Sequence, residues 1–184
     1  MNLYNNSASQ AYFAFNIWSI ESAQAILEVA ADGGHDVILQ TSEKVFERID
    51  NETLRAFVTN YTYKRKIHGY LHLDHCRRID CIQRAIRCGW DSVMLDASDK
   101  SLEENIRLTN EVCAMAKARG VYVEAEIGQI RGVEDDIAAI EDGVAKIEDV
   151  EQFLCNTKVD MLAVAIGTSH GVYCREPRLH YELI

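Results

Sequence analysis

The sequence predicts an α/β fold built on parallel strands: an incomplete TIM-type (β/α)8 barrel with about six of eight β/α units, or an open doubly wound sheet. Short apolar runs alternate with longer segments of helical periodicity, which is typical of a parallel sheet with helical crossovers. Two of these runs lead into histidines, and the carboxyl ends of parallel strands meet on one face of a barrel. Periodicity alone does not separate the two folds.

The predicted elements follow one another without a composition change that would mark a domain boundary. Strands are expected at residues 12–15, 37–40, 70–74, 92–96, 121–127 and 161–166. Helices are expected at residues 20–31, 43–66, 78–87, 102–119 and 147–155. Ser19 and Ser101 precede two of these helices as N-caps, and Gly33-Gly34 can end the first of them. We therefore predict a single domain over residues 1–184.

Composition excludes several classes of protein. The 184 residues carry a net charge of −10 without a block of Lys or Arg, so we expect no nucleic-acid partner. No apolar run approaches the length of a membrane span, and the first residues do not read as a signal peptide. The six cysteines lack CxxC spacing, so we predict reduced thiols and a cytoplasmic location. No glycine-rich phosphate loop follows the first strand, which disfavours a dinucleotide site.

The segment from residue 128 to residue 143 differs from the other connections. It is acidic and has a glycine at each end. Long connections in compact α/β repeats more often serve as lids or binding segments than as plain links. We therefore predict an acidic active-site lid loop at residues 128–143.

An acid and an imidazole stand side by side at the end of the third predicted strand. Neighbouring residues of a regular strand point to opposite faces, so Asp74 and His75 can line one site only if the chain leaves strand geometry there. His72, two positions earlier, we interpret as a structural residue.

Further polar residues end the later strands. Asp96 and Glu126 place carboxylates at two strand ends, and His170 follows the last predicted strand. Two convergent imidazoles beside a carboxylate are suitable ligands for catalytic zinc. Each residue taken singly is readily explained as structural, but acids at successive strand ends indicate a common site.

Six motifs follow one another along the chain. They are Ala14-Phe15-Asn16, His72-Leu73-Asp74-His75, Val93-Met94-Leu95-Asp96-Ala97-Ser98, Val123-Glu124-Ala125-Glu126-Ile127-Gly128, Gly132-Val133-Glu134-Asp135-Asp136 and Ala165-Ile166-Gly167-Thr168-Ser169-His170-Gly171-Val172-Tyr173. Their order and spacing resemble those of one enzyme family, the class II, zinc-dependent ketose-bisphosphate aldolases, and the resemblance covers residues 11–184.

The resemblance implies a TIM-barrel lyase that cleaves a ketose 1,6-bisphosphate through an enediolate. The products would be dihydroxyacetone phosphate and glyceraldehyde 3-phosphate. It implies that His75 and His170 are Zn²⁺ ligands, with Asp96 and Glu126 at an alternative metal position. The resemblance does not choose between fructose, tagatose and deoxy-gluconate phosphates as substrates. The residues around His170 are more similar to those of the tagatose-bisphosphate branch.

The remaining roles also come from the resemblance. Asp74 would be the acid that acts on the aldehyde oxygen, and Glu134 on the lid would be the base. Asn16, Ser42 and Gly171 would contact substrate, Gly171 also at a site for a monovalent cation, Na⁺ or K⁺.

The family's third zinc histidine and its other phosphate contacts lie on the seventh and eighth strands, which have no counterpart among the six predicted here. We therefore expect a C-terminally truncated barrel that forms a homo-oligomer or pairs with a complementing barrel chain. We also expect little activity from the isolated chain. The alternative function is that of a non-catalytic subunit.

Overall fold

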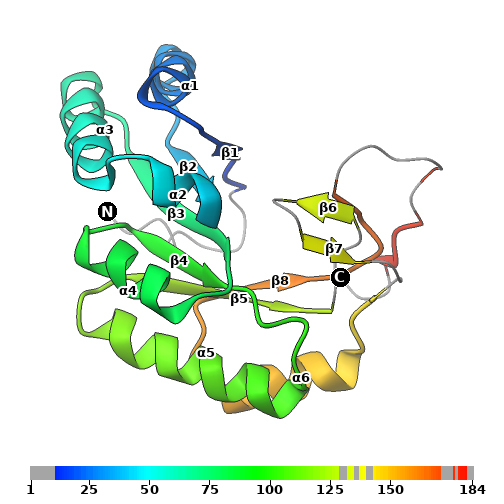
Figure 1. The fold of residues 1–184 in the computed structure, drawn as a ribbon. Helices are drawn as coiled ribbons and strands as arrows, with labels where there is room; N and C mark the ends of the chain where they lie inside the picture. The colour runs from blue at the N-terminus through cyan, green and yellow to red at the C-terminus, as the bar shows by residue number, and fades with distance from the viewer. Residues whose placement is uncertain are drawn as a thin grey trace.

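The computed structural model describes residues 11–128, 132–134, 137–139, 143–170, 176 and 178–181. Its central feature is a curled parallel sheet with the strand order β1-β2-β3-β4-β5-β8, and the helices line its convex side (Figure 1). The sheet is an incomplete TIM-type barrel, as predicted. Its strands are β1 (Ala14–Asn16), β2 (Val37–Ser42), β3 (Gly69–Cys76), β4 (Ser92–Leu95), β5 (Tyr122–Ile127) and β8 (Met161–Val164).

The helices begin and end close to the predicted positions. Ser19 and Ser101 both act as N-caps: the Ser19 side chain accepts a hydrogen bond from the Ser22 amide, and Ser101 accepts one from the Glu104 amide. The prediction of one continuous helix over residues 43–66 is wrong. The chain turns at residues 49–50, and Asp50 caps a second helix there by accepting from the Thr53 amide. The helices are α1 (Ile20–Gly33), α2 (Glu43–Arg48), α3 (Asn51–Arg65), α4 (Ile79–Arg87), α5 (Leu102–Lys117) and α6 (Ile147–Asn156).

The segment predicted as a lid contains a hairpin rather than loop alone. Strands β6 (Gly132–Glu134) and β7 (Ile137–Ala139) pair antiparallel in a sheet of their own. The two ends of the segment meet, because a Cβ atom on Gly128 would lie 2.4 Å from the Gly143 carbonyl oxygen. Gly128 also has a φ of +79°, so both the space and the backbone conformation require glycine. This arrangement closes the base of the hairpin over the end of β5.

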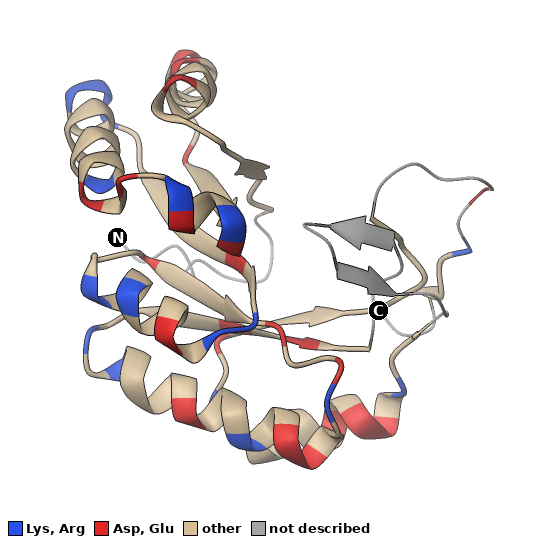
Figure 2. Cartoon of the chain, in the orientation of Figure 1, with Lys and Arg blue, Asp and Glu red and all other residues tan. Residues whose placement is uncertain are grey.

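Apolar side chains fill the layer between the sheet and the helices. At its centre Phe46 of α2 meets Trp90 edge to face, with ring centroids 5.0 Å apart, and both side chains are fully buried. A smaller cluster around Phe153 packs α6 against β5. The strands carry few charges, while Lys, Arg, Asp and Glu are interspersed on the helices (Figure 2). None of the described helices is long and apolar enough to cross a membrane.

Both outer strands of the sheet pair with another described strand on one side only. β1 pairs with β2, and β8 pairs with β5. Beside β1 lies an apolar groove of roughly 680 Å³ between this strand and α1, lined by residues that include Phe13, Phe15 and Val29. Phe13 is 72% exposed, which is unusual for so large an apolar side chain. The β1 edge of the half-barrel therefore presents an apolar face, together with backbone groups that no other described strand pairs.

The Phe46–Trp90 contact predicts where stability is concentrated. Phe46→Ala should lower the free energy of unfolding by about 3–5 kcal/mol, because it opens a cavity in a fully buried cluster. Tyr63→Ala is the matched control: Tyr63 is 85% exposed, so its truncation should change stability by less than about 0.5 kcal/mol. Urea unfolding measures both changes, and equal effects of the two substitutions would contradict the assigned core.

Candidate active site

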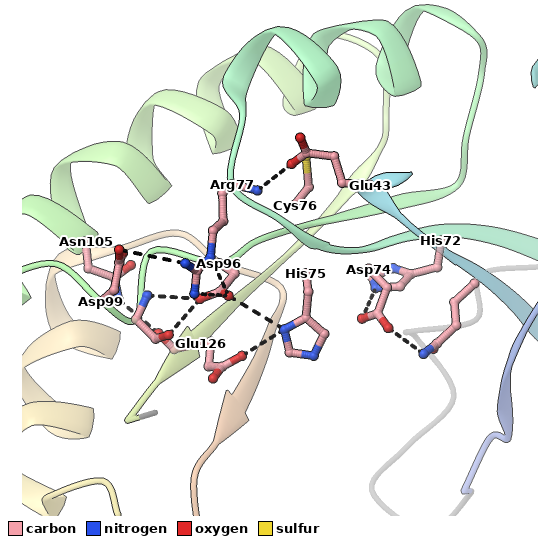
Figure 3. Close-up of polar contacts among 12 residues, drawn as sticks. Glu43, His72, Asp74, His75, Cys76, Arg77, Asp96, Asp99, Asn105 and Glu126 are labelled. Atoms are coloured by element: carbon pink, nitrogen blue, oxygen red, sulfur yellow. Dashed lines mark hydrogen bonds and ion pairs between the residues drawn. The ribbon is translucent and has the colours of Figure 1, made fainter. Parts of the chain in front are cut away.

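A bulge at the end of β3 brings two neighbouring side chains to one side of the sheet. Leu73 pairs with Val93 and Cys76 pairs with Leu95, so β3 contains one residue more than β4 between these two pairs. His75 occupies the irregularity with a φ of +44°, a conformation that is strained for a residue other than glycine. The chain thus leaves strand geometry where the sequence requires it, and Asp74 and His75 both lie at the carboxyl end of the sheet (Figure 3).

His75 points toward two carboxylates from the next two strands. Its Nδ1 atom lies 3.3 Å from Glu126 Oε2 and 3.8 Å from Asp96 Oδ2. Asp96 follows β4, Glu126 belongs to β5, and all three side chains are largely buried (Figure 3). One ligand atom from each lies within 4.8 Å of the other two, which is close enough to hold a single metal ion.

The two carboxylates differ in how they are held. Asp96 Oδ1 accepts from the Ser98 amide at 3.1 Å and from the Ser98 hydroxyl at 2.7 Å, and Asp96 Oδ2 accepts from the Arg77 guanidinium at 3.2 Å. Glu126 is fixed through its backbone, whose carbonyl accepts from Asn105 Nδ2 at 2.9 Å. Glu126 Oε2 is buried, and among the described residues it makes no hydrogen bond of good geometry, although it lies 3.3 Å from His75. Glu126 is therefore the carboxylate more open to a further ligand.

The cluster strongly favours positive charge. Burial lowers the pKa of His75, but contacts with Asp96, Glu126 and Asp74 outweigh burial and raise it to about 11. Burial raises the pKa of Asp96, but His75, Ser98 and Arg77 hold it well below the ordinary range. A site that binds a proton this firmly between carboxylates also suits a divalent cation, because both reduce the repulsion between the buried acids.

Asp74 is held from the interior of the half-barrel. Gln40 Nε2 of β2 donates to Asp74 Oδ2 at 2.6 Å. His72 Nε2 lies 3.8 Å from Asp74 Oδ1 and 3.5 Å from Glu124 Oε2. Burial, followed by repulsion from Asp74, raises the pKa of Glu124 to about 7. His72, interpreted from the sequence as structural, thus lies directly beside the predicted acid.

Of the other predicted site residues, some are described in full, one only by its backbone, and one not at all. The His170 ring meets the His75 ring edge-on, with centroids 5.1 Å apart, so these two histidines come together. Asn16 is exposed at the end of β1, and half-buried Ser42 ends β2 in register with Asp74. The structure gives only the backbone of Glu134, in β6, and Gly171 lies outside the described residues.

Sequence reasoning did not single out the side chains that hold the predicted acids. Gln40, Arg77 and Ser98 bind Asp74 or Asp96 directly. Gln40 had a usable signal, since it is the polar member of an otherwise apolar run. Arg77 and Ser98 had none, because charged and small polar residues are common after any strand.

Comparison with known proteins identifies the lineage of this arrangement. The family model of class-II fructose-bisphosphate aldolase matches residues 3–184. The chain belongs to this family. A curated relative, the sulfofructosephosphate aldolase of Alkalicoccus urumqiensis, is 36% identical over 173 residues, which cover 93% of this chain and 60% of the relative.

Solved structures of class II aldolases share the fold. A Coccidioides immitis protein assigned as a fructose-1,6-bisphosphate aldolase superposes with a TM-score of 0.83 at 31% identity over 94% of this chain and 61% of that one. The YdjI aldolase of Escherichia coli K12 superposes with a TM-score of 0.77 at 28% identity, over 94% and 60% of the two chains. The chain thus spans about three fifths of the length of these relatives.

The His75 cluster of this class II aldolase homologue predicts weak binding of Zn²⁺, since catalytic zinc normally has three protein ligands and Asp96 is already bound by Arg77 and Ser98. His75→Ala should weaken binding by more than the roughly 10–100-fold that follows loss of an outer partner of a metal ligand. His170→Ala should also weaken it. Calorimetric titration with Zn²⁺ measures both effects.

The control for this titration is His68→Ala. His68 is an exposed histidine that pairs with Asp36 just before β3 begins, away from the cluster. Its removal should leave Zn²⁺ affinity unchanged. If neither His75→Ala nor His170→Ala changes the affinity, the ligand assignment is wrong.

Proposed function

We propose that this chain carries the metal-binding part of a zinc-dependent aldolase site that cleaves a ketose 1,6-bisphosphate to dihydroxyacetone phosphate and glyceraldehyde 3-phosphate. The observation that carries the proposal is the convergence of His75, Asp96 and Glu126 beside Asp74 at the carboxyl ends of the strands. Barrel enzymes place their chemistry on this face. Membership of the class II family supports the same reaction type.

The residues of the cluster fit the proposed cation. An imidazole nitrogen and carboxylate oxygens are ordinary Zn²⁺ ligands, and the buried Glu126 Oε2, 3.3 Å from His75 Nδ1, makes no hydrogen bond among the described residues. We propose His75 and His170 as ligands, with Asp96 and Glu126 at the same or an alternative position. A bound divalent cation would supply Lewis-acid polarisation of a ketone oxygen.

Asp74 and Glu134 would move the protons of the reaction. Asp74 is held by Gln40, so its carboxyl group meets a substrate oxygen in a fixed orientation. Glu134 would remove the carbon-bound proton, and its place in β6 puts it on the hairpin proposed as the lid. Asn16, Ser42 and Gly171 are proposed substrate contacts, Gly171 also for a monovalent cation. The curated relative is named a sulfofructosephosphate aldolase, which adds a sulfonated sugar phosphate to the candidate substrates.

A second candidate is a non-catalytic subunit or a chain that requires a complementing barrel segment. Among the described strands β1 and β8 each pair on one side only, and this favours the second candidate, because a half-barrel with an apolar edge is stabilised by a partner that covers that edge. Homo-oligomerisation would cover the same surface.

Cleavage assays separate the two candidates. The isolated 184-residue chain should cleave fructose or tagatose bisphosphate little or not at all, and reassembly with a complementing β/α segment should produce cleavage that EDTA and His75→Ala abolish and His68→Ala does not. Cleavage that persists with EDTA and in His75→Ala would contradict the metal-dependent mechanism. Reassembly that restores Zn²⁺ affinity without cleavage would favour the non-catalytic subunit.

The proposed base is tested in the reassembled barrel. Glu134→Gln keeps the shape of the side chain and removes the base, so exchange of the dihydroxyacetone phosphate proton with deuterated water should slow by about 10²–10⁴-fold. Zn²⁺ content should stay the same, since Glu134 is not a proposed ligand. NMR follows the exchange. Undiminished exchange would move the base elsewhere, with Asp74 the next candidate, and loss of Zn²⁺ would place Glu134 among the metal ligands.

A further inference from the structure

A layer of polar side chains lies inside the half-barrel, beneath the metal cluster, and two of its members, His72 and Ser92, have no role in the proposed reaction. Gln40 of β2, His72 of β3 and Ser92 of β4 are direct cross-strand neighbours in the sheet. His72 is only 4% exposed and Ser92 is fully buried. Buried polar groups persist where they are paired, so the partners of His72 define what the layer does.

The two ring nitrogens of His72 have different surroundings. Nδ1 lies 2.8 Å from the Ser92 hydroxyl, which can either donate or accept a hydrogen bond. Nε2 lies 3.5 Å from Glu124 Oε2 and 3.8 Å from Asp74 Oδ1. Ionised carboxylates only accept, so a lone pair on Nε2 would face two further acceptors.

One protonation pattern makes these contacts complementary. Burial, with a smaller effect of the charge on His75, lowers the pKa of His72 to about 4, so the ring is neutral and carries one N–H. If that N–H is on Nε2, it faces the carboxylates, and the Ser92 hydroxyl donates to Nδ1. The other tautomer would turn the Nε2 lone pair toward Asp74 and Glu124.

We propose that His72 is a positioning residue for Asp74, with its proton on Nε2 and its Nδ1 held by a hydrogen bond from the Ser92 hydroxyl. In this arrangement Gln40 binds Asp74 Oδ2 while the Nε2–H group attracts Asp74 Oδ1, so the carboxylate is held from both oxygens. At 3.8 Å the second contact is electrostatic, and contacts of this kind often shorten when substrate binds. The catalytic role of these two contacts rests on the proposed function, in which Asp74 acts on a substrate oxygen.

The first test is the tautomer itself. Nitrogen-15 NMR of the full 184-residue chain at pH 8, above the pKa of about 7 of Glu124, reports which ring nitrogen carries the proton. We expect the Nδ1 resonance of His72 at the far downfield position of an unprotonated nitrogen and Nε2 at the upfield position of a protonated one. Ser92→Ala should shift Nδ1 and leave Nε2 protonated. A proton on Nδ1, protons on both nitrogens, or a Nδ1 resonance that Ser92→Ala does not move would overturn the proposal.

The second test compares two replacements of similar size at His72. A glutamine amide reaches the position of Nε2, whereas an asparagine amide reaches only that of Nδ1. The carbon-13 carboxyl resonance of Asp74, measured at the same pH, should shift in His72→Asn and return toward the native position in His72→Gln. Urea unfolding shows whether each variant is folded. If either variant is unfolded, the tautomer of His72 in the unmodified chain is the test of the proposal. Equal shifts in the two folded variants would show that His72 acts through packing alone.

These outcomes are independent of the proposed function. Loss of the predicted tautomer with normal Zn²⁺ binding at His75 would remove the positioning role and leave the metal site intact. Failure of the His75→Ala titration together with the predicted tautomer would remove the metal assignment and leave the Ser92–His72–Asp74 arrangement as a property of the fold.

Discussion

The extra residue in β3 is the constraint on which the site depends. In a regular strand Asp74 and His75 would lie on opposite faces, one in the barrel interior and one against the helices. The positive φ of His75 removes that alternation, and such conformations typically cost about 1–3 kcal/mol. The surroundings compensate for this strain, because Cys76 returns to register with Leu95 and its carbonyl accepts from the Asp96 amide.

Electrostatics around the bulge divide into an upper and a lower level. At the strand ends, His75 lies among carboxylates that stabilise positive charge. One layer deeper, His72 is kept neutral by burial and contacts the acid from below. Two histidines three residues apart therefore have opposite shifts in pKa, because only the upper one meets enough negative charge to offset the loss of solvent. Their different environments favour positive charge at His75 and a neutral, hydrogen-bonding ring at His72.

The sequence was sufficient for features that depend on local patterns. The α/β class, the strand positions and the caps at Ser19 and Ser101 follow from periodicity and from residue types near helix ends. The polar ends of successive strands also predicted that Asp74, His75, Asp96 and Glu126 would converge. What the sequence could not supply were contacts across distant segments, such as Gln40 with Asp74. The break between α2 and α3 was also missed, because both helices continue the same mixture of apolar and charged residues.

The order of the strands in the main sheet is also their order along the chain, apart from the inserted hairpin. Each new strand therefore pairs with the one synthesised before it, and no strand has to be threaded between two others. The half-barrel can grow unit by unit as the polypeptide leaves the ribosome, where amino-terminal segments fold first. During this growth the most recently formed strand has backbone groups free to pair with the next strand to be synthesised. The order of synthesis therefore favours correct pairing, in addition to side-chain packing.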